Sequence, residues 1–339
     1  MPDSEKLLLE DPGIHLIVGF RGTTLEEELK DLIKELRIGG VCLYKRNIQS
    51  AEQLRSLLRD AQAFARETLG RPLWLTIDQE GGPVQRLVPP PFTRLPSAHD
   101  LSLEGPRSVA RWSALAAGEL RELGIQINLA PVLDLVTGGA SHFMLSRSLG
   151  SDPESVAQLG KTWIRSLQEN GVSATAKHFP GLGRAESDPH HYAPVIRWRH
   201  EDEMLKDLLP FREAISSGVH CVMTSHALYP FLDPVWPATL SPAINHEWLR
   251  NRLRFEGVLL SDDLDMAAVS QKYSWEEMAR QGLLSTIDFF LVCQHSENIE
   301  PFYRAFRNVI ESESEAAAFR SSSVRRIGRL FQKHRDSPF

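Results

Sequence analysis

A histidine and a carboxylate stand two residues apart in a Gly- and Pro-rich segment that begins Lys177-His178-Phe179-Pro180-Gly181. The segment has neither helical nor strand periodicity, which is typical of a functional loop rather than of a core element. In an extended chain, Asp188 and His190 point to the same side. The carboxylate would fix the tautomer of the imidazole and favour its protonated form, so His190 is a candidate proton donor near neutral pH.

Two other interpretations of this segment stay open. Four of its side chains could form a metal site: His178, Asp188, His190 and His191. Metal ligands usually show tighter spacing, such as two histidines separated by three residues on a helix, so proton transfer is the better hypothesis. The segment could also be a surface loop that happens to contain histidines.

A second cluster of ionisable residues ends the apolar run 257–261, where Asp262, Asp263 and Asp265 follow in quick succession. A carboxylate at the end of a strand can act as the nucleophile of covalent glycosyl transfer. The alternative is helix capping, in which Asp262 or Asp263 caps a helix that begins near Leu264. Capping would employ one carboxylate and leave the others free for chemistry.

Two further clusters supply groups that could bind hydroxyls. The segment 78–86 contains two consecutive glycines, which allow a tight backbone path, so the carboxylate of Asp78 and the guanidinium of Arg86 can face one pocket. A polar loop with a solvated ion pair is an equally good interpretation of these residues alone. Arg147, which follows the loop after Asp134, is a weak signal by itself and is interpreted as a surface arginine.

The motifs of several other enzyme classes are absent from the sequence. No Gly-x-Gly-x-x-Gly follows the first predicted strand, and there is no Walker loop and no Gly-x-Ser-x-Gly. The sequence therefore does not indicate dinucleotide binding, a P-loop nucleotide site or an α/β-hydrolase nucleophile.

Short apolar runs alternate along the chain with amphipathic stretches that have helical spacing. The predicted strands are residues 14–19, 40–44, 73–78, 126–130, 173–178, 220–226, 257–262 and 288–293. The predicted helices are residues 24–37, 51–69, 106–123, 154–170, 202–216, 275–286 and 299–311. Alternation of this kind predicts a parallel sheet with helical crossovers, and eight repeats favour a closed barrel.

The predicted strand ends support a barrel enzyme, because Asp78, His178, His226 and Asp262 all stand at such ends. Active sites of barrels lie at the carboxyl ends of the strands. We therefore predict one domain over residues 1–339, an α/β fold built as a single (β/α)8 TIM barrel. Thr24 should cap the first helix, and the segment 311–335 should form a terminal helix on the barrel exterior.

Composition narrows the class of protein. The 339 residues include 38 Lys and Arg against 44 Asp and Glu, a net charge of −6, which argues against nucleic acid or an anionic membrane as partner. Cys42, Cys221 and Cys293 each sit in an apolar run and are expected to be buried free thiols. No signal peptide or membrane span is apparent, so we expect a cytoplasmic enzyme that works as a monomer.

Together these clusters resemble glycoside hydrolase family 3, and specifically its β-N-acetylglucosaminidases of peptidoglycan recycling. The resemblance runs from the segment 40–47 to the segment 291–293. Its most specific parts are residues 78–86, Pro131-Val132-Leu133-Asp134, residues 177–183 followed by Asp188-x-His190, and Ser261-Asp262-Asp263.

The resemblance implies a retaining β-N-acetylhexosaminidase that releases N-acetylglucosamine from peptidoglycan-derived muropeptides through a covalent glycosyl-enzyme. Asp262 matches the family's nucleophile, and His190, paired with Asp188, matches its acid/base. The residues that match those holding the N-acetylglucosamine ring are Asp78, Arg86, Arg147, Lys177 and His178. The family implies a small carbohydrate substrate, no metal and no other cofactor.

The sequence departs from the family pattern at a few positions. Leu182 stands where the family usually has His, Pro83 where it has Arg, and Leu149 where it has an aromatic residue. Pro189 replaces Ser or Thr, which deletes a backbone N–H and restricts Asp188 to extended geometry. Since the catalytic positions are all present, we expect an active enzyme.

Two alternatives of other classes stay open at this point. A catalytically silent sugar-binding homologue would keep Asp78, Lys177 and His178 without a working acid. A zinc-dependent barrel hydrolase would use His178, Asp188, His190 and His226.

Overall fold

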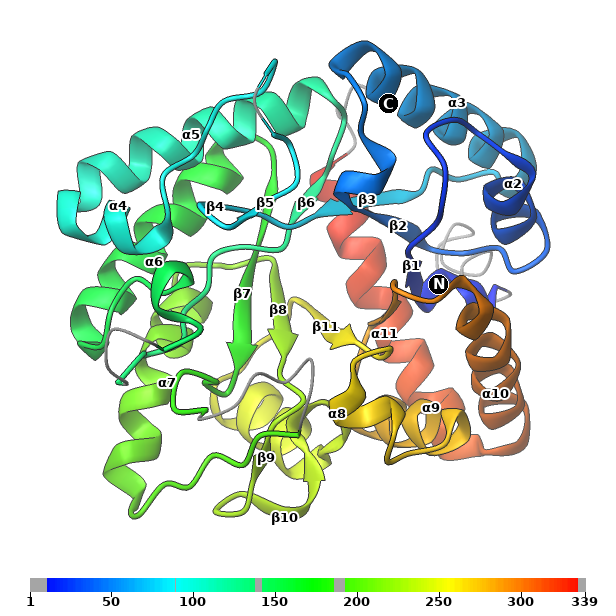
Figure 1. Ribbon diagram of the computed structural model, residues 1–339. Coiled ribbons are helices and arrows are strands. Elements are labelled where there is room, and N and C mark those ends of the chain that lie inside the picture. The colour runs from blue at the N-terminus through cyan, green and yellow to red at the C-terminus, as the bar shows by residue number, and fades with distance from the viewer. Residues whose placement is uncertain (1–10, 89, 138–141, 186–192, 335–339) are drawn as a thin grey trace.

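The computed structural model describes residues 11–88, 90–137, 142–185 and 193–334, and its parallel strands close into a barrel (Figure 1). The strand order around the barrel is β1-β12-β11-β8-β7-β6-β3-β2. The strands are β1 (Leu16–Val18), β2 (Gly40–Leu43), β3 (Trp74–Ile77), β6 (Ile127–Asn128), β7 (Ser173–Phe179), β8 (Cys221–Thr224), β11 (Val258–Asp263) and β12 (Phe289–Val292). The predicted TIM barrel is confirmed, and each predicted strand overlaps one barrel strand, although β7 and β11 each run one residue past the predicted end.

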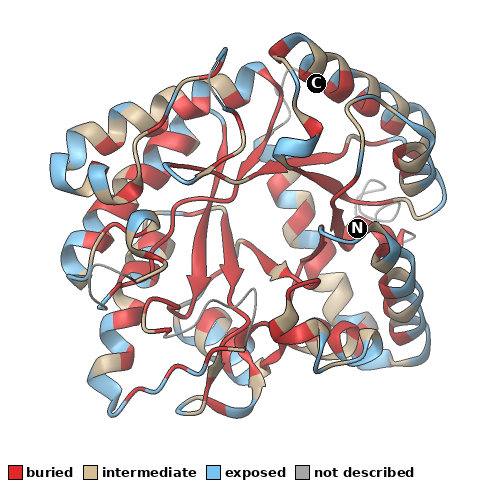
Figure 2. Ribbon diagram, viewed as in Figure 1, coloured by how far each residue is buried: buried red, intermediate tan, exposed pale blue. Residues whose placement is uncertain are grey.

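Helices surround the barrel and turn their apolar sides toward the strands, which Figure 2 shows as buried. They are α2 (Glu27–Lys34), α3 (Ala51–Leu69), α4 (Ala98–Glu104), α5 (Pro106–Glu122), α6 (Pro153–Glu169), α7 (Glu201–Ser216), α8 (Ala267–Ser270), α9 (Trp275–Leu284), α10 (Ile299–Ser312) and α11 (Ser314–Lys333). Shorter helical turns are η1 (Pro12–His15), η2 (Lys45–Asn47), η3 (Leu145–Arg147), η4 (Ala238–Leu240) and η6 (Ser296–Asn298), and η5 (Ala243–Arg252) is π-helical.

The start of α2 corrects one prediction. The hydroxyl of Thr24 donates to Oε1 of Glu26 instead of capping a helix. The helix begins only at Glu27, and Glu26 before it makes no side-chain cap. The backbone N–H of Glu26 donates to the carbonyl oxygen of Thr24, so the chain turns at these residues before the helix begins.

The terminal helix α11 exists as predicted, but its predicted place on the barrel exterior is wrong, because it lies across the amino ends of the strands. The ring of Phe331 lies 4.3 Å from that of Trp74, the first residue of β3. Arg326 reaches Asp288, the residue before β12, with a nitrogen–oxygen distance of 2.8 Å. Large apolar side chains at this end of the barrel need a cover, and α11 supplies it. The opposite, carboxyl end stays open for chemistry.

Two short hairpins that the sequence did not reveal stand beyond strand ends. The first is β4 (Gln79–Gly81) with β5 (Val84–Gln85), and the second is β9 (Leu228–Tyr229) with β10 (Asp233–Pro237). The first hairpin turns at Gly81 and Gly82, which have φ angles of 93° and 53°. A Cβ on Gly81 would lie 2.3 Å from the carbonyl oxygen of Pro96, so the turn needs glycine for both its backbone angle and its packing.

Two expectations from composition concern properties of the whole fold. Cys42, Cys221 and Cys293 are buried and free, as predicted. In the described part of the chain, no helix is both long and apolar enough to cross a membrane.

Candidate active site

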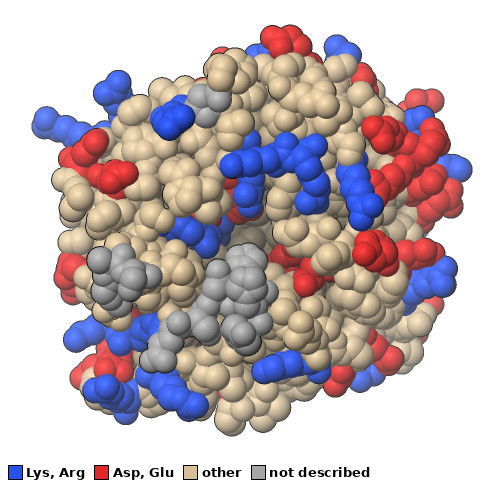
Figure 3. Space-filling view, viewed as in Figure 1, with Lys and Arg blue, Asp and Glu red and all other residues tan. Residues whose placement is uncertain are grey.

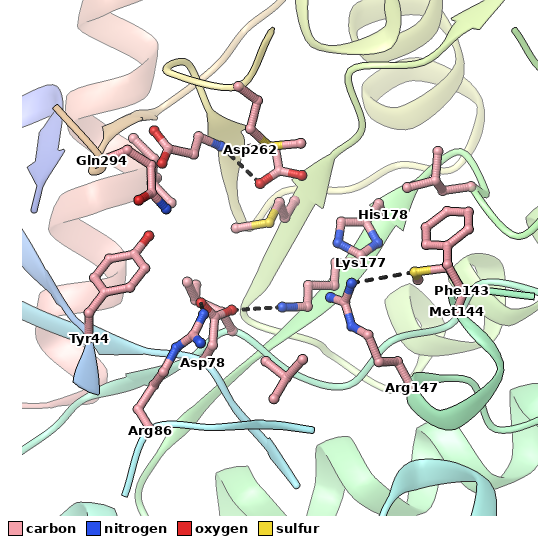
Figure 4. A pocket seen from close by; sticks show the side chains of 17 residues that line it. Tyr44, Asp78, Arg86, Phe143, Met144, Arg147, Lys177, His178, Asp262 and Gln294 are labelled. Atoms are coloured by element: carbon pink, nitrogen blue, oxygen red, sulfur yellow. Dashed lines mark hydrogen bonds and ion pairs between the residues drawn. The ribbon is translucent and has the colours of Figure 1, made fainter. Parts of the chain in front are cut away.

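A cavity of about 130 Å³ opens at the carboxyl end of the barrel. Figure 3 shows a hollow in this face with Lys and Arg side chains gathered along one side. The predicted nucleophile and all five predicted sugar-binding residues line this one cavity (Figure 4): Asp78, Arg86, Arg147, Lys177, His178 and Asp262. Residues separated by almost 200 positions in the chain meet here because parallel barrel strands end at the same rim.

Irregular pairing at two strand ends turns consecutive side chains into the cavity. Between β7 and β8, the segment from Ala176 to Phe179 is one residue longer than its partner segment. The same occurs between β11 and β12, from Leu260 to Asp263. Bulges of this kind re-aim side chains next to active sites. They explain how Lys177 and His178, and likewise Asp262 and Asp263, can both line one cavity.

Asp78 at the end of β3 is held between two cations. Nζ of Lys177 lies 2.9 Å from its Oδ1, and Nη2 of Arg86 lies 3.0 Å from its Oδ2. Burial alone would raise the pKa of Asp78, but Lys177 and Arg86 more than reverse this and lower it. Asp78 and Arg86 therefore belong to a largely buried ion-pair cluster at the cavity and do not form a solvated ion pair.

Glu80 is a buried partner of two cavity residues that the sequence reasoning did not identify. It receives two hydrogen bonds of 2.8 Å from Nε and Nη2 of Arg147, and Nζ of Lys177 lies 2.6 Å from its Oε1. Burial raises the pKa of Glu80, but Arg147 and Lys177 lower it to about 2. The interpretation of Arg147 as a surface arginine is wrong, because its side chain is 18% exposed and lines the cavity. The spacing could have identified Glu80, because a residue two positions after Asp78 points to the same side in extended backbone.

Asp134 is the second residue that the sequence reasoning did not assign to the site. Its carboxylate is fully buried and accepts hydrogen bonds from Nδ1 of His178 (2.7 Å), the backbone N–H of His178 and the backbone N–H of Leu182 (2.7 Å). This arrangement fixes the His178 ring with Nδ1–H toward Asp134 and leaves Nε2 available to the cavity. The motif at residues 131–134 pointed to Asp134, but the sequence did not show that His178 is its partner.

The three carboxylates at the end of β11 and just after it, Asp262, Asp263 and Asp265, have different surroundings. Asp265 accepts from the N–H groups of Gln294 and His295 and from Asn298, so it fixes the turn after β12. Asp263 accepts from the N–H groups of Asp265 and Cys293. None of them caps a helix, because α8 begins after Met266 without a side-chain cap.

Asp262 is the carboxylate that remains available to a substrate. Its Oδ1 accepts from the N–H of Asp263 at 2.8 Å, and its side chain lines the cavity. Burial raises the pKa of Asp262, but the positive potential of His178 and His226 outweighs burial and lowers it. Asp262 is therefore an ionised carboxylate at neutral pH.

The described residues offer no ready metal site. Among residues 11–88, 90–137, 142–185 and 193–334, no group of three or more His, Cys, Asp or Glu side chains could hold a metal ion. Both ring nitrogens of His226 have partners, Oγ1 of Thr239 and the carbonyl oxygen of Asp263. The predicted acid/base pair, Asp188 and His190, lies outside the described residues.

The positions that depart from the family pattern have ordinary structural places. Leu182 is buried and lines the cavity, where its backbone N–H binds Asp134. Leu149 is buried in the core, and Pro83 is exposed in the turn of the first hairpin. Pro189 lies outside the described residues.

Comparisons with known proteins agree on one family. The model of the glycosyl hydrolase family 3 N-terminal domain matches residues 9–330. The β-hexosaminidase of Alkalilimnicola ehrlichii is 37% identical over 296 residues, which cover 85% of this chain and 83% of that protein. The β-hexosaminidase of Tolumonas auensis is 32% identical over 305 residues, with 89% of each chain covered.

Solved structures give the same result. A β-N-acetylhexosaminidase from Beutenbergia cavernae superposes with a TM-score of 0.88 at 29% identity, covering 96% of this chain and 98% of that one. A family 3 β-N-acetylglucosaminidase from Paenibacillus sp. has a TM-score of 0.91 at 34% identity, and this chain spans 62% of its length. The chain therefore belongs to glycosyl hydrolase family 3, and it is a TIM-barrel β-hexosaminidase.

Proposed function

We propose that this β-hexosaminidase is a retaining β-N-acetylhexosaminidase that uses Asp262 as its nucleophile. The observation that carries the proposal is the state of Asp262. It lines the cavity, and its pKa is lowered despite burial. The neighbouring carboxylates, Asp263 and Asp265, are engaged with backbone N–H groups. A carboxylate that is ionised and open to the cavity is what covalent glycosyl transfer requires.

The polar groups on the other side of the cavity suit the hydroxyls of one sugar ring. Carboxylate oxygens of Asp78 accept hydrogen bonds, while Lys177, Arg86 and Arg147 donate them. The ion pairs among these groups fix each donor and acceptor before substrate arrives. Preorganisation of this kind spares a substrate the cost of ordering the side chains. Nε2 of His178 supplies a further polar contact beside Asp262.

The reaction follows from these groups. A carboxylate oxygen of Asp262 attacks the anomeric carbon as the bond to the leaving oxygen breaks, and the acid gives that oxygen a proton. We assign the role of the acid to His190, whose protonated form Asp188 would favour, and this assignment depends on the sequence match alone. His190 then removes a proton from water, which attacks the anomeric carbon and releases Asp262. A nucleophile with a lowered pKa is also a good leaving group in this second step.

The substrate class is a β-linked N-acetylhexosamine, and we propose N-acetylglucosamine on peptidoglycan-derived muropeptides. The Paenibacillus relative, a β-N-acetylglucosaminidase, supports the sugar. The muropeptide rests on the motif resemblance at residues 78–86 and 177–190. Three buried free cysteines suit a reducing compartment, so we place the enzyme in the cytoplasm.

The test is covalent labelling. A 2-fluoro sugar that traps the glycosyl-enzyme should label Asp262, and Asp262→Ala should remove hydrolysis of an aryl β-N-acetylglucosaminide while leaving the fold intact. Asp265→Asn is the matched control, since it removes a nearby carboxylate that faces backbone N–H groups, and it should leave labelling at Asp262. A label on Asp263 or Asp265 would show that the nucleophile is assigned wrongly.

A further inference from the structure

Asp263 is buried directly beside the proposed nucleophile, and its two carboxyl oxygens have very different surroundings. Oδ1 accepts hydrogen bonds from the backbone N–H groups of Asp265 (3.2 Å) and Cys293 (3.0 Å). Oδ2 is shielded from solvent and has no hydrogen-bond partner among the residues that the structure describes. The residue as a whole is only 6% exposed. Oδ1 therefore has two hydrogen-bond donors, whereas Oδ2 has none among the described residues.

An ionised carboxylate would be costly in this place. A buried negative charge must be balanced by a cation or by donors to both oxygens, otherwise the group keeps its proton. The nearby cations are already engaged, because Lys177 and Arg147 pair with Glu80, and Arg86 pairs with Asp78. In the part of the chain that the structure describes, no lysine or arginine forms an ion pair with Asp263.

None of the other titratable groups around Asp263 in the described chain forms a hydrogen bond with Oδ2. They are Asp262 and Asp265 from β11 and the turn after it, Cys42 and Tyr44 from β2 and its end, Cys293 after β12, and His226 after β8. His226 donates to the backbone carbonyl of Asp263 and not to its side chain. Burial and the charge of Asp265 raise the pKa of Asp263 well above its ordinary value, and the two backbone hydrogen bonds offset only part of this.

We propose that Asp263 is a neutral carboxylic acid in the active enzyme and acts as a positioning residue for Asp262, an inference that rests on the proposed function. Its Oδ1 ties the end of β11 to Cys293 after β12. Its backbone N–H, fixed by that tie, donates to Oδ1 of Asp262 at 2.8 Å. Because Asp263 carries no charge, the strand end presents one negative charge to the anomeric carbon, and Asp262 stays ionised.

The first test measures protonation without any use of activity. A group that keeps its proton only in the folded state makes the protein more stable as pH falls toward the ordinary carboxyl pKa. Unfolding by urea should be followed for wild type and Asp263→Asn between about pH 8 and about pH 5. As the pH is lowered from about 8 to about 5, the unfolding equilibrium constant of wild type should fall relative to that of the variant, by up to about tenfold for each pH unit.

Asp233→Asn is the matched control for this comparison. Asp233 is also a buried carboxylate, but both its oxygens accept hydrogen bonds, from the N–H groups of Val235 and Trp236 and from Ser241, and it lies outside the cavity. Its ratio to wild type over the same pH range is the baseline for the comparison. A ratio for Asp263→Asn that does not change with pH would show that Asp263 is ionised and would overturn the proposal.

The second test separates positioning from a general structural role. The acid limb of the kcat/KM profile reports ionisation of the nucleophile in the free enzyme. Asp263→Asn removes no charge if Asp263 is neutral, so the midpoint of the limb should stay in place. Asp263→Ala loses the acceptor for the Cys293 N–H, and its kcat should fall about tenfold or more below that of Asp263→Asn.

The two proposals fail in different ways. A limb that moves to lower pH in Asp263→Asn would show that a negative charge had been removed and would overturn the inference about Asp263. Equal kcat values for the Asn and Ala variants would overturn the positioning role. If the fluoro sugar labels another residue, the proposed nucleophile falls, while the stability comparison still decides the charge of Asp263.

Discussion

Nδ1 of His178 lies 2.7 Å from Oδ2 of Asp134, and both side chains are buried. The same carboxylate accepts the backbone N–H groups of His178 and Leu182. One anion thus fixes the ring of a cavity residue and the backbone turn that follows it. No other acceptor is within reach of that Nδ1–H in the described structure, so the orientation of His178 depends on the charge of Asp134.

Asp134→Asn should lower kcat/KM for an aryl β-N-acetylglucosaminide by roughly 10- to 100-fold, which corresponds to the loss of a charge-assisted hydrogen bond. An amide at this place has one acceptor oxygen for three donors, so the His178 ring loses its fixed tautomer. NMR of the His178 ring nitrogens should report the change. Asp233→Asn, a buried carboxylate remote from the cavity, is the control. Unchanged ring signals with reduced activity would contradict this role.

His190→Ala should slow hydrolysis of a natural disaccharide far more than hydrolysis of a nitrophenyl glycoside. A poor leaving group needs its proton in the transition state, whereas nitrophenolate departs largely unaided. The gap between the two substrates should approach the ~10²–10⁴-fold range of general acid catalysis. Asp188→Asn should show a weaker form of the same pattern, because it removes the charge that orients the imidazole.

His191→Ala is the control for the acid assignment, since the neighbouring side chain points the other way in extended backbone and its loss should be mild. Equal slowing of both substrates by His190→Ala, or a larger defect in His191→Ala, would mean that the acid is a different residue.

Activity should survive chelation. The proposed chemistry needs only a carboxylate and a proton donor, and His226, one of the ligands of the zinc alternative, has both ring nitrogens engaged. Hydrolysis rates should therefore be equal before and after dialysis against EDTA. Loss of activity that added zinc restores would favour the metal mechanism.

His15, a buried residue of η1, should contribute a loss of stability in mild acid, which is opposite in sign to the contribution expected from Asp263. Nδ1 of His15 lies 2.9 Å from the carbonyl oxygen of Asp288, and Nε2 has no hydrogen-bond partner in the described part of the chain. Burial, with a smaller effect of Arg320, lowers the pKa of His15 to about 3. Below about pH 6.5, His15 binds a proton in the unfolded chain but stays neutral in the folded chain. The contribution of neutral His15 to stability is therefore complete above about pH 6.5 and is lost as pH falls toward 3.

The measurement is the free energy of unfolding between pH 6.5 and 5, a range that lies above the titration of the cavity carboxylates whose pKa values are lowered. For wild type, His15 contributes up to about 1.4 kcal/mol of lost stability per pH unit. His15→Gln should flatten the pH dependence by that amount, and His246→Gln, an exposed histidine, serves as control. Parallel curves for wild type and His15→Gln would contradict the prediction.

The sequence by itself determined the barrel and the group of residues at its rim. Strand and helix periods are local properties, so alternation along the chain was enough to predict eight parallel strands. Topology then placed Asp78, Lys177, His178 and Asp262 together, because each stands at the carboxyl end of a strand and such ends converge in a closed barrel.

Only the tertiary structure decided what each ionisable group does there. Glu80 and Asp134 are acids in loops by sequence, yet both are buried partners of cavity residues. The sequence alone favoured a surface position for Arg147, but in the fold its side chain lies at the cavity, where it pairs with the buried Glu80. The family resemblance selected Asp262 among the three carboxylates, and the structure supports that selection, because N–H donors about 30 residues away, at Cys293 and Gln294, engage Asp263 and Asp265. Burial and hydrogen-bond partners set the charge of a carboxyl group, and the partners come from strands that are neighbours only after folding.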